Sequence, residues 1–278
     1  MYQEYRPSRF QILPPVVKNL LIINGIMFLA TSVLNMKFGI DLTDYLGLYF
    51  PLSKKFGIYQ LVSHLFMHGS FMHILSNMFA LWMFGNMLEN VWGSKRFLTY
   101  YLITGIGAAV VHLMFTWYEV EQMRSTIDVY AASANFTDFK MLLDKYHGFI
   151  FPEQYEYYNS IYTSWQLEPG SASVKQQSID AAYHLIQNKY DVPTVGASGA
   201  VFGVLLAFGM LFPNTILYVY FALPIKAKYF VALYGLFELY SGFENTPGDN
   251  VAHFAHLGGM LFGFILLRIY RSKRSNFY

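Results

Sequence analysis

A serine flanked by glycines is the first residue of this chain that could do chemistry. Ser198 stands in a GASG segment that runs from Gly196 to Gly199, shortly after Pro193 and at the start of an apolar run. The first N–H groups of a helix have no partner within the helix, so a serine there can expose its hydroxyl beside donors that would stabilise an oxyanion. The alternative is structural, because Gly199 and Gly203 are four residues apart and such pairs let helices approach closely.

A histidine in the last apolar segment has the chemistry to activate that serine. A serine is a weak nucleophile until a base takes its proton, and an imidazole with a pKa of about 6.5 suits that role. His256 is followed by Gly259 and Gly263, which share a helix face, so a closely packed partner helix would meet the imidazole. His253 is a second candidate one turn earlier. We rank it lower because it precedes the glycine face, and its alternative role is a hydrogen bond at the helix terminus.

A third polar pair lies in the second apolar segment. His73 and Asn77 are four residues apart and therefore share one face of a helix. Both can direct a donor at one point, as an oxyanion hole built from side chains requires. Taken singly, either residue would more simply be a hydrogen-bond partner of a neighbouring helix. In the topology derived below, His73, Ser198 and His256 all fall in the outer half of the bundle, and this shared depth favours a single site.

The elements that must position these residues are membrane helices. The chain is 55% hydrophobic and 13% charged, whereas an ordinary soluble domain has about 25% charged residues. Six stretches meet or approach the roughly 20 apolar residues that a helix needs to cross a bilayer. They cover residues 15–36, 71–92, 97–118, 197–212, 228–243 and 251–270. The first exceeds the apolar core of a signal peptide, about 7 to 15 residues, so we expect a polytopic membrane protein.

The distribution of basic residues predicts the orientation. With six spans and both termini in the cytoplasm, the inner segments are rich in Lys and Arg and hold few acids, as the positive-inside rule requires. The inner basic residues are Arg6, Arg9, Lys18, Lys95, Arg96, Lys226, Lys228, Arg268, Arg271, Lys273 and Arg274. The outer connections mix eight Lys and Arg residues with most of the acids. The short tails favour a bacterial inner-membrane protein.

Two outer connections are long enough to have a role of their own. Residues 37–70 are aromatic and apolar, whereas residues 119–193 are polar, acidic and rich in tyrosine. Within the second, residues 138–146 and 174–189 have helical periodicity, and Asn135 or Thr137 can cap the first helix. We expect helices 1–3 with the outer loop in residues 1–118, an extracytoplasmic helical insertion in 119–193, and helices 4–6 in 194–278.

Together the three motifs resemble those of the rhomboid family, which has a GxSG serine motif, an AHxxGxxxG histidine motif on the last helix and HxxxN on the second. Here they are Gly196 to Gly199, Ala255 to Gly263 and His73 to Asn77, in the order that the family uses. The resemblance extends from about residue 15 to 270, apart from the insertion. It implies an all-α membrane protein with a bundle of six transmembrane helices and a small extracytoplasmic helical insertion.

The resemblance implies an intramembrane serine endopeptidase in which Ser198 and His256 form a dyad without an acid. His73, Asn77 and the backbone N–H of Ser198 would bind the oxyanion. The substrates would be transmembrane proteins in the lipid bilayer, cut beside small residues after the substrate helix unwinds locally, because a fully paired helix hides its carbonyl groups. The reaction would need neither a cofactor nor a metal.

Supporting residues also follow from the resemblance. Glu89, with Trp92, resembles an acidic structural site at the inner end of the second helix, and His68 resembles a loop histidine that tethers the outer loop. Tyr59 and Gln60 stand where some members have Trp-Arg. The insertion is the larger departure. It would sit over the active-site side, and we expect it to screen substrates or shape water access, which its deletion would test.

Other classes remain as alternatives. An inactive relative would be a binding or trafficking protein, but such relatives typically lose the serine or the histidine. A metal or haem protein is suggested by His64 with His68 and by His253 with His256, although the chain has no HExxH motif and no cysteine. A transporter would need a polar path across the membrane, and Glu238 is the main unassigned acid near a span. No basic patch indicates nucleic-acid binding.

Overall fold

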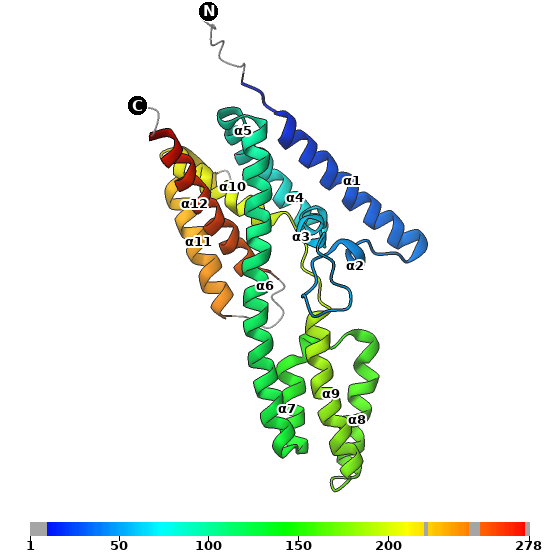
Figure 1. Cartoon of the computed structure of the whole chain (residues 1–278). Helices are drawn as coiled ribbons and strands as arrows, with labels where there is room; N and C mark the ends of the chain where they lie inside the picture. The colour runs from blue at the N-terminus through cyan, green and yellow to red at the C-terminus, as the bar shows by residue number, and fades with distance from the viewer. Residues whose placement is uncertain (1–9, 220–221, 245–250, 276–278) are drawn as a thin grey trace, which may run out of the picture.

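The computed structural model describes residues 10–219, 222–244 and 251–275, with side chains as far as residue 270. One helix of 40 residues, α6 (Ser94–Ser133), runs the length of the molecule and belongs to two helical bodies (Figure 1). Some of the basic residues expected on the inner side lie outside the described part. These are Arg6 and Arg9, and the side chains of Arg271, Lys273 and Arg274.

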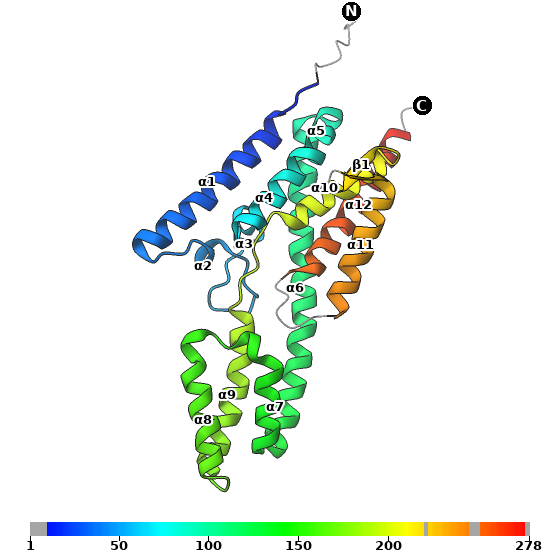
Figure 2. The ribbon, with the colours of Figure 1, turned by 180° about the vertical axis from the view of Figure 1, so that it is seen from behind.

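The larger body contains a helix at each of the six predicted spans. Helix α4 continues through a π-helical turn, η2, into α5, so these three elements form the second helix (Figures 1 and 2). The helices besides α6 are α1 (Pro15–Phe38), α4 (Phe71–Ala80), η2 (Leu81–Gly85), α5 (Asn86–Trp92), α10 (Ser198–Leu211), α11 (Ala227–Glu244) and α12 (His253–Ser275). The expected all-α membrane bundle is confirmed. Its start at α1 and its end at α12 lie at the same end of the molecule.

Three of the described helices, α1, α6 and α12, are long and apolar enough to cross a membrane, and α10 is a shorter apolar helix. Helix α1 exposes large apolar side chains along much of its length, including Ile26, Leu29 and Met36, which suits contact with lipid. The number of spans stays a prediction. A feature that we did not predict is a two-stranded antiparallel hairpin between α10 and α11, formed by β1 (Ile216–Val219) and β2 (Leu223–Lys226).

The first helix is anchored by a carboxylate from another element. Helix α1 has no side-chain cap from its own N-cap residue. Instead the buried Glu89 of α5 accepts the N–H groups of Val16 and Val17 at 2.9 and 2.8 Å, and the hydroxyl of Ser94 at 2.6 Å. A carboxylate at a helix N-terminus satisfies unpaired donors and interacts favourably with the helix dipole. The structural role that we expect for Glu89 would act through these bonds.

The central helices α6, α10 and α12 touch through glycines. A Cβ added at Gly259 of α12 would overlap the carbonyl oxygen of Gly199 in α10, and one at Gly263 would overlap the hydroxyl of Tyr100 in α6. That hydroxyl also donates to the carbonyl oxygen of Gly203, at 2.8 Å. Close backbone contact of this kind requires residues without side chains. It fixes the register of α12 against α10, and therefore the position of His256 along α10.

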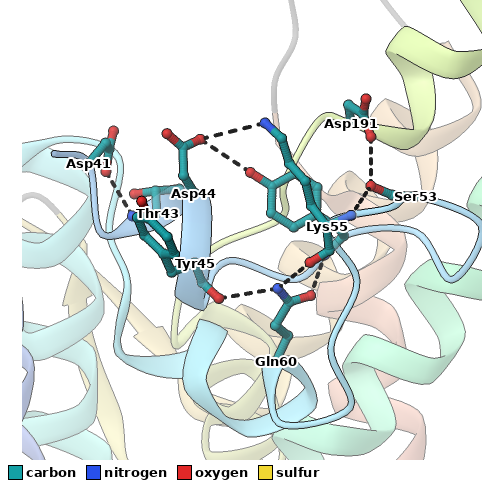
Figure 3. A network of polar contacts seen from close by, with 9 residues as sticks. Asp41, Thr43, Asp44, Tyr45, Ser53, Lys55, Gln60 and Asp191 are labelled. Atoms are coloured by element: carbon teal, nitrogen blue, oxygen red, sulfur yellow. Dashed lines mark hydrogen bonds and ion pairs between the residues drawn. The ribbon is translucent and has the colours of Figure 1, made fainter.

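The outer loop is held together from inside by Gln60 (Figure 3). The loop contains α2 (Thr43–Leu46), α3 (Gln60–Ser63) and the short η1 (His64–Phe66). The Gln60 amide donates to the carbonyl oxygens of Tyr45 and Lys55 at 3.2 and 2.9 Å, and its own oxygen accepts from the N–H of Gly57 at 3.1 Å. Gln60 is fully buried, so these bonds satisfy an amide that would otherwise be costly.

Backbone and side-chain hydrogen bonds join this loop to the chain that leads into Ser198. Leu48 and Thr194 exchange backbone hydrogen bonds of 2.9 and 2.8 Å as an isolated antiparallel bridge. Beside them the Ser53 hydroxyl donates to the Asp191 carboxylate at 2.6 Å (Figure 3). The outer loop therefore buttresses the segment that precedes the serine.

The insertion forms the second body with a separate core. It contains α7 (Phe136–Tyr146), α8 (Tyr155–Leu167) and α9 (Ala172–Tyr190), with short turns η3 (His147–Phe149) and η4 (Pro152–Gln154). These helices pack on the far half of α6 (Figure 2). Asn135 caps α7 by accepting the N–H of Asp138 at 3.0 Å. The sequence predicted α7 and α9, but not α8 or the continuation of α6 to Ser133.

The glycine contact gives a direct test of the packing. We expect Gly259→Ala to lower stability by about 1–3 kcal/mol, because the new methyl group has to push α12 away from α10. The measurement is the thermal unfolding midpoint of the purified protein in detergent.

The matched control is Gly25→Ala in α1, where an added Cβ meets nothing within 4 Å. This change should be neutral or stabilise by up to about 1 kcal/mol, because alanine is the better helix former. Equal midpoints for the two variants would contradict the close contact between α10 and α12.

Candidate active site

Ser198 is the first residue of α10, and the turn before it requires a glycine. Gly196 has φ of +125°, and its N–H donates to the carbonyl oxygen of His64 at 2.9 Å. A Cβ at Gly196 would lie only 2.7 Å from Nε2 of His73. The glycine therefore allows both the sharp turn and the approach of His73 to the serine segment.

His256 lies in the first turn of α12 and faces the serine. Its Nε2 is 2.9 Å from the Ser198 hydroxyl oxygen. Its ring stacks on Phe202, one turn after Ser198, with centroids 4.1 Å apart and planes at 7°. The imidazole is buried, and two contacts with α10 hold it in place. The structure therefore joins Ser198 and His256, two residues that the sequence singled out separately.

A third group, Glu238 of α11, is absent from the dyad that the resemblance implied. One carboxylate oxygen, Oε2, lies 2.8 Å from Nδ1 of His256 and 2.7 Å from Nδ1 of His253. An ionised carboxylate only accepts hydrogen bonds, so the Nδ1 atom of each histidine carries a hydrogen and donates it to Oε2. The only sequence signal was an acid inside an apolar segment. Its distance along the chain from His256 matches no motif.

The pair His73 and Asn77 lies on α4, beside the serine segment. His73 approaches Gly196, as described above, and its ring contacts that of His68 edge-on with centroids 5.0 Å apart. The side-chain amide of Asn77 donates to the carbonyl oxygen of His73 at 3.1 Å, within the same helix. This bond uses one of the two hydrogens on the amide nitrogen. Of the two residues, it is thus His73 that the described contacts bring to the serine segment.

His68 does not hold the outer loop by a hydrogen bond in the described part of the chain. The residue is buried, with an exposed fraction of 4%, and neither of its ring nitrogens has a partner among the described residues. The loop is tied instead by the bond from Gly196 to His64 and by the bridge between Leu48 and Thr194. Burial, and secondarily the neighbouring His73, lowers the pKa of His68 to about 3.

The acid and the two histidines also have the composition of a metal site. Ligand atoms of Glu238, His253 and His256 lie within 4.8 Å of one another. Their separations of 2.7 and 2.8 Å are those of charge-assisted hydrogen bonds to one oxygen. A metal ion would need both Nδ1 atoms without their protons. The sequence alternative of His64 with His68 is weaker, because Nδ1 of His64 lies 2.7 Å from the Gln60 carbonyl oxygen.

Comparison with known proteins identifies one family. The Rhomboid domain model matches residues 55–123 and 174–273, which together are more than half of the chain. Rhomboid-like protein 15 of Arabidopsis thaliana is 29% identical over 104 residues, covering 37% of this chain and 25% of that protein. RHOMBOID-like protein 12, mitochondrial, from the same organism is 24% identical over 264 residues, covering 94% of this chain and 60% of that protein. The chain thus spans at most three fifths of these relatives' lengths.

The match covers the candidate site but only part of the second body. The matched segments include Ser198, His256, Glu238, His73 and Asn77. The unmatched residues 124–173 contain α7 and α8. The candidate site therefore lies entirely in the part of the chain that the family model covers.

The buried His68 predicts a loss of stability in mild acid. The unfolded chain takes up a proton at the ordinary pKa of 6.5, whereas the folded chain keeps this imidazole neutral down to about 3. The free energy of unfolding therefore falls as the pH drops below 6.5, by about 1.4 kcal/mol at pH 5.5 from this group alone. We expect His68→Leu to reduce the drop in thermal midpoint between pH 7.5 and 5.5.

The control is His147→Leu, which removes an exposed histidine of the insertion and should leave the drop unchanged. If His68→Leu and the wild type lost the same number of degrees, His68 would not be held neutral in the folded protein.

Proposed function

The chain belongs to the rhomboid family, and from this membership and the contact between Ser198 and His256 we propose that it is an intramembrane serine endopeptidase. Its substrates are transmembrane segments of other membrane proteins. The observation that carries the proposal is the 2.9 Å separation between the Ser198 hydroxyl oxygen and Nε2 of a buried imidazole, because an activated nucleophile needs a base within hydrogen-bond reach.

The reaction divides into acylation and hydrolysis. Nε2 of His256 accepts the Ser198 proton as the serine oxygen attacks a peptide carbonyl carbon. The resulting imidazolium donates this proton to the leaving amine as the C–N bond breaks, which leaves an acyl-enzyme. Water, deprotonated by the same imidazole, then attacks the ester and frees the serine.

The oxyanion is bound by His73, Asn77 and the N–H of Ser198. The first described intrahelical bond of α10 runs from the Val201 N–H to the Ala197 carbonyl oxygen. The N–H of Ser198 precedes it and belongs to the unpaired donors of a helix start. The closeness of His73 to Gly196 supports its part in this hole. Donors fixed before the reaction are the most effective means of stabilising developing charge.

The length of α10 supports cleavage within the membrane. Its 14 residues rise by about 21 Å, whereas the hydrocarbon layer is about 30 Å thick. A helix of this length whose inner end reaches the interface begins inside the layer, so Ser198 lies below the outer surface. A substrate helix has to unwind there to present a carbonyl group, and small residues at the cleavage position ease this approach.

We expect Ser198→Ala and His256→Ala to lower the cleavage rate by at least about a thousandfold, because each removes a partner of one proton transfer. The measurement is turnover of a fluorogenic transmembrane peptide by purified protein in detergent. Labelling of the serine by a fluorophosphonate reports the nucleophile without a substrate.

The controls are Ser160→Ala and His147→Ala, which change exposed residues of the insertion and should retain full activity. Cleavage that survives Ser198→Ala would refute the serine mechanism. A wild type that neither cleaves nor takes the label would instead point to an inactive, substrate-binding relative.

The basic residues support an orientation in which both termini are cytoplasmic and the insertion is extracytoplasmic, as in a bacterial inner membrane. The chain has no cysteine, so single cysteines can report the side. We expect a membrane-impermeant maleimide to label Ser173→Cys in intact bacterial cells, and Lys95→Cys only after lysis. Both positions are exposed. The reverse labelling pattern would invert the topology.

A further inference from the structure

An almost fully buried acid sits against the base of the proposed mechanism. Glu238 has an exposed fraction of 3%, whereas Leu236, Phe237 and Tyr240 around it on α11 are mostly exposed. Burying an ionised carboxylate in an apolar bundle costs free energy unless it is paired and hydrogen-bonded. Both bonds of its Oε2 that the structure describes come from α12, from His253 and His256. The acid is thus directed at the helix that holds the base.

The bond from His256 to Glu238 determines which nitrogen of the imidazole can act. With its proton on Nδ1 and directed at the carboxylate, the neutral ring has its lone pair on Nε2. That nitrogen faces the Ser198 hydroxyl at 2.9 Å. In the opposite tautomer Nε2 would carry a hydrogen and could not accept the serine proton. The carboxylate therefore selects the reactive form of the base.

The orientation of the ring is fixed by two perpendicular constraints. Phe202 covers one face of the imidazole at 4.1 Å and 7°, and Glu238 holds its edge at 2.8 Å. Stacking alone lets a ring turn in its own plane, whereas a hydrogen bond at one edge stops this rotation. The two contacts together keep Nε2 aimed at the serine.

We infer that Glu238 is a positioning residue that converts the expected Ser198–His256 dyad into a Ser198–His256–Glu238 triad. This inference rests on the proposed function. During acylation the serine proton moves to Nε2, the imidazolium forms, and Glu238 remains ionised and keeps accepting the Nδ1 hydrogen. The positive ring then lies beside a fixed negative charge in a region of low dielectric constant, which stabilises it.

His253 acts through Glu238 and not on the serine. Its Nδ1 donates to the same Oε2 at 2.7 Å, so the carboxylate oxygen is held by two N–H groups one helical turn apart. This second bond fixes the side chain of Glu238 in the conformation that meets His256. The sequence left the role of His253 open, and the geometry assigns it to the support of the acid.

The test compares Glu238→Ala and Glu238→Gln with the wild type as full-length protein in detergent. The readouts are kcat and KM on the transmembrane peptide, the rate of fluorophosphonate labelling and the thermal midpoint. The alanine variant should lose about a hundredfold or more in both kcat and labelling rate, with KM within about threefold. The glutamine variant should lose less, about tenfold, because its amide oxygen still accepts the Nδ1 hydrogen but has no charge to stabilise the imidazolium.

The matched control is Glu244→Gln, which changes an exposed acid at the end of the same helix and should behave as the wild type. A purely structural role would lower the thermal midpoint while folded protein kept its kcat and labelling rate, and that result would overturn the inference. If the alanine variant does not fold, the kcat and labelling rate of the folded glutamine variant test the inference in the same way.

Two further outcomes separate this inference from its premises. If the wild type takes the label, and the folded Glu238 variants have kcat and labelling rates within about threefold of the wild type, the triad alone is overturned. A wild type that neither labels nor cleaves overturns the proposed function and the triad with it. Treatment of the wild type with EDTA should leave labelling unchanged, and a loss would assign the cluster of Glu238, His253 and His256 to a metal ion.

Discussion

The contact between the backbones of α10 and α12 determines most of what this structure can do. Gly259 meets the carbonyl oxygen of Gly199, so the two helices lie as close as backbones allow, and neither can slide without a clash. Ser198 begins one helix and His256 lies one turn before the contact on the other. Their separation of 2.9 Å is therefore a consequence of helix packing, and it does not depend on a flexible loop.

The same bundle satisfies its buried polar groups by a repeated device. Glu89 accepts two backbone N–H groups at the start of α1, Gln60 joins four backbone groups of the outer loop, and Glu238 accepts two imidazole N–H groups. Each is a buried acid or amide of one element with several partners from another segment. In an apolar environment an unpaired polar group is costly, so each of these residues fixes the segments that it joins. Two of them stabilise the scaffold, whereas the third is in contact with the base of the candidate site.

The insertion is a second body built on an extension of a bundle helix. Because α6 continues without a break to Ser133, its far half provides one wall of the separate core formed with α7, α8 and α9. A salt bridge of 3.0 Å between Lys189 and Glu119 fastens α9 to α6, and the bond from Ser53 to Asp191 joins this body to the outer loop of the bundle. The segment from Asp191 to Ser198 thus connects the insertion to the serine.

The sequence by itself determined the membrane class, the helix at each expected span and the candidates Ser198, His256, His73 and Asn77. It could do so because hydropathy and spacings of three or four residues report what happens within one helix. Only the tertiary structure decided that Glu238 meets His256, that Gln60 holds the outer loop and that His68 lacks a hydrogen bond in the described chain. The contact of Glu238 with His256 joins two helices, and it depends on how far one helix is displaced along the other and rotated against it. Gln60 bonds a loop residue 15 positions away, and the burial of His68 depends on the residues packed around it, so no local pattern of residues encodes either.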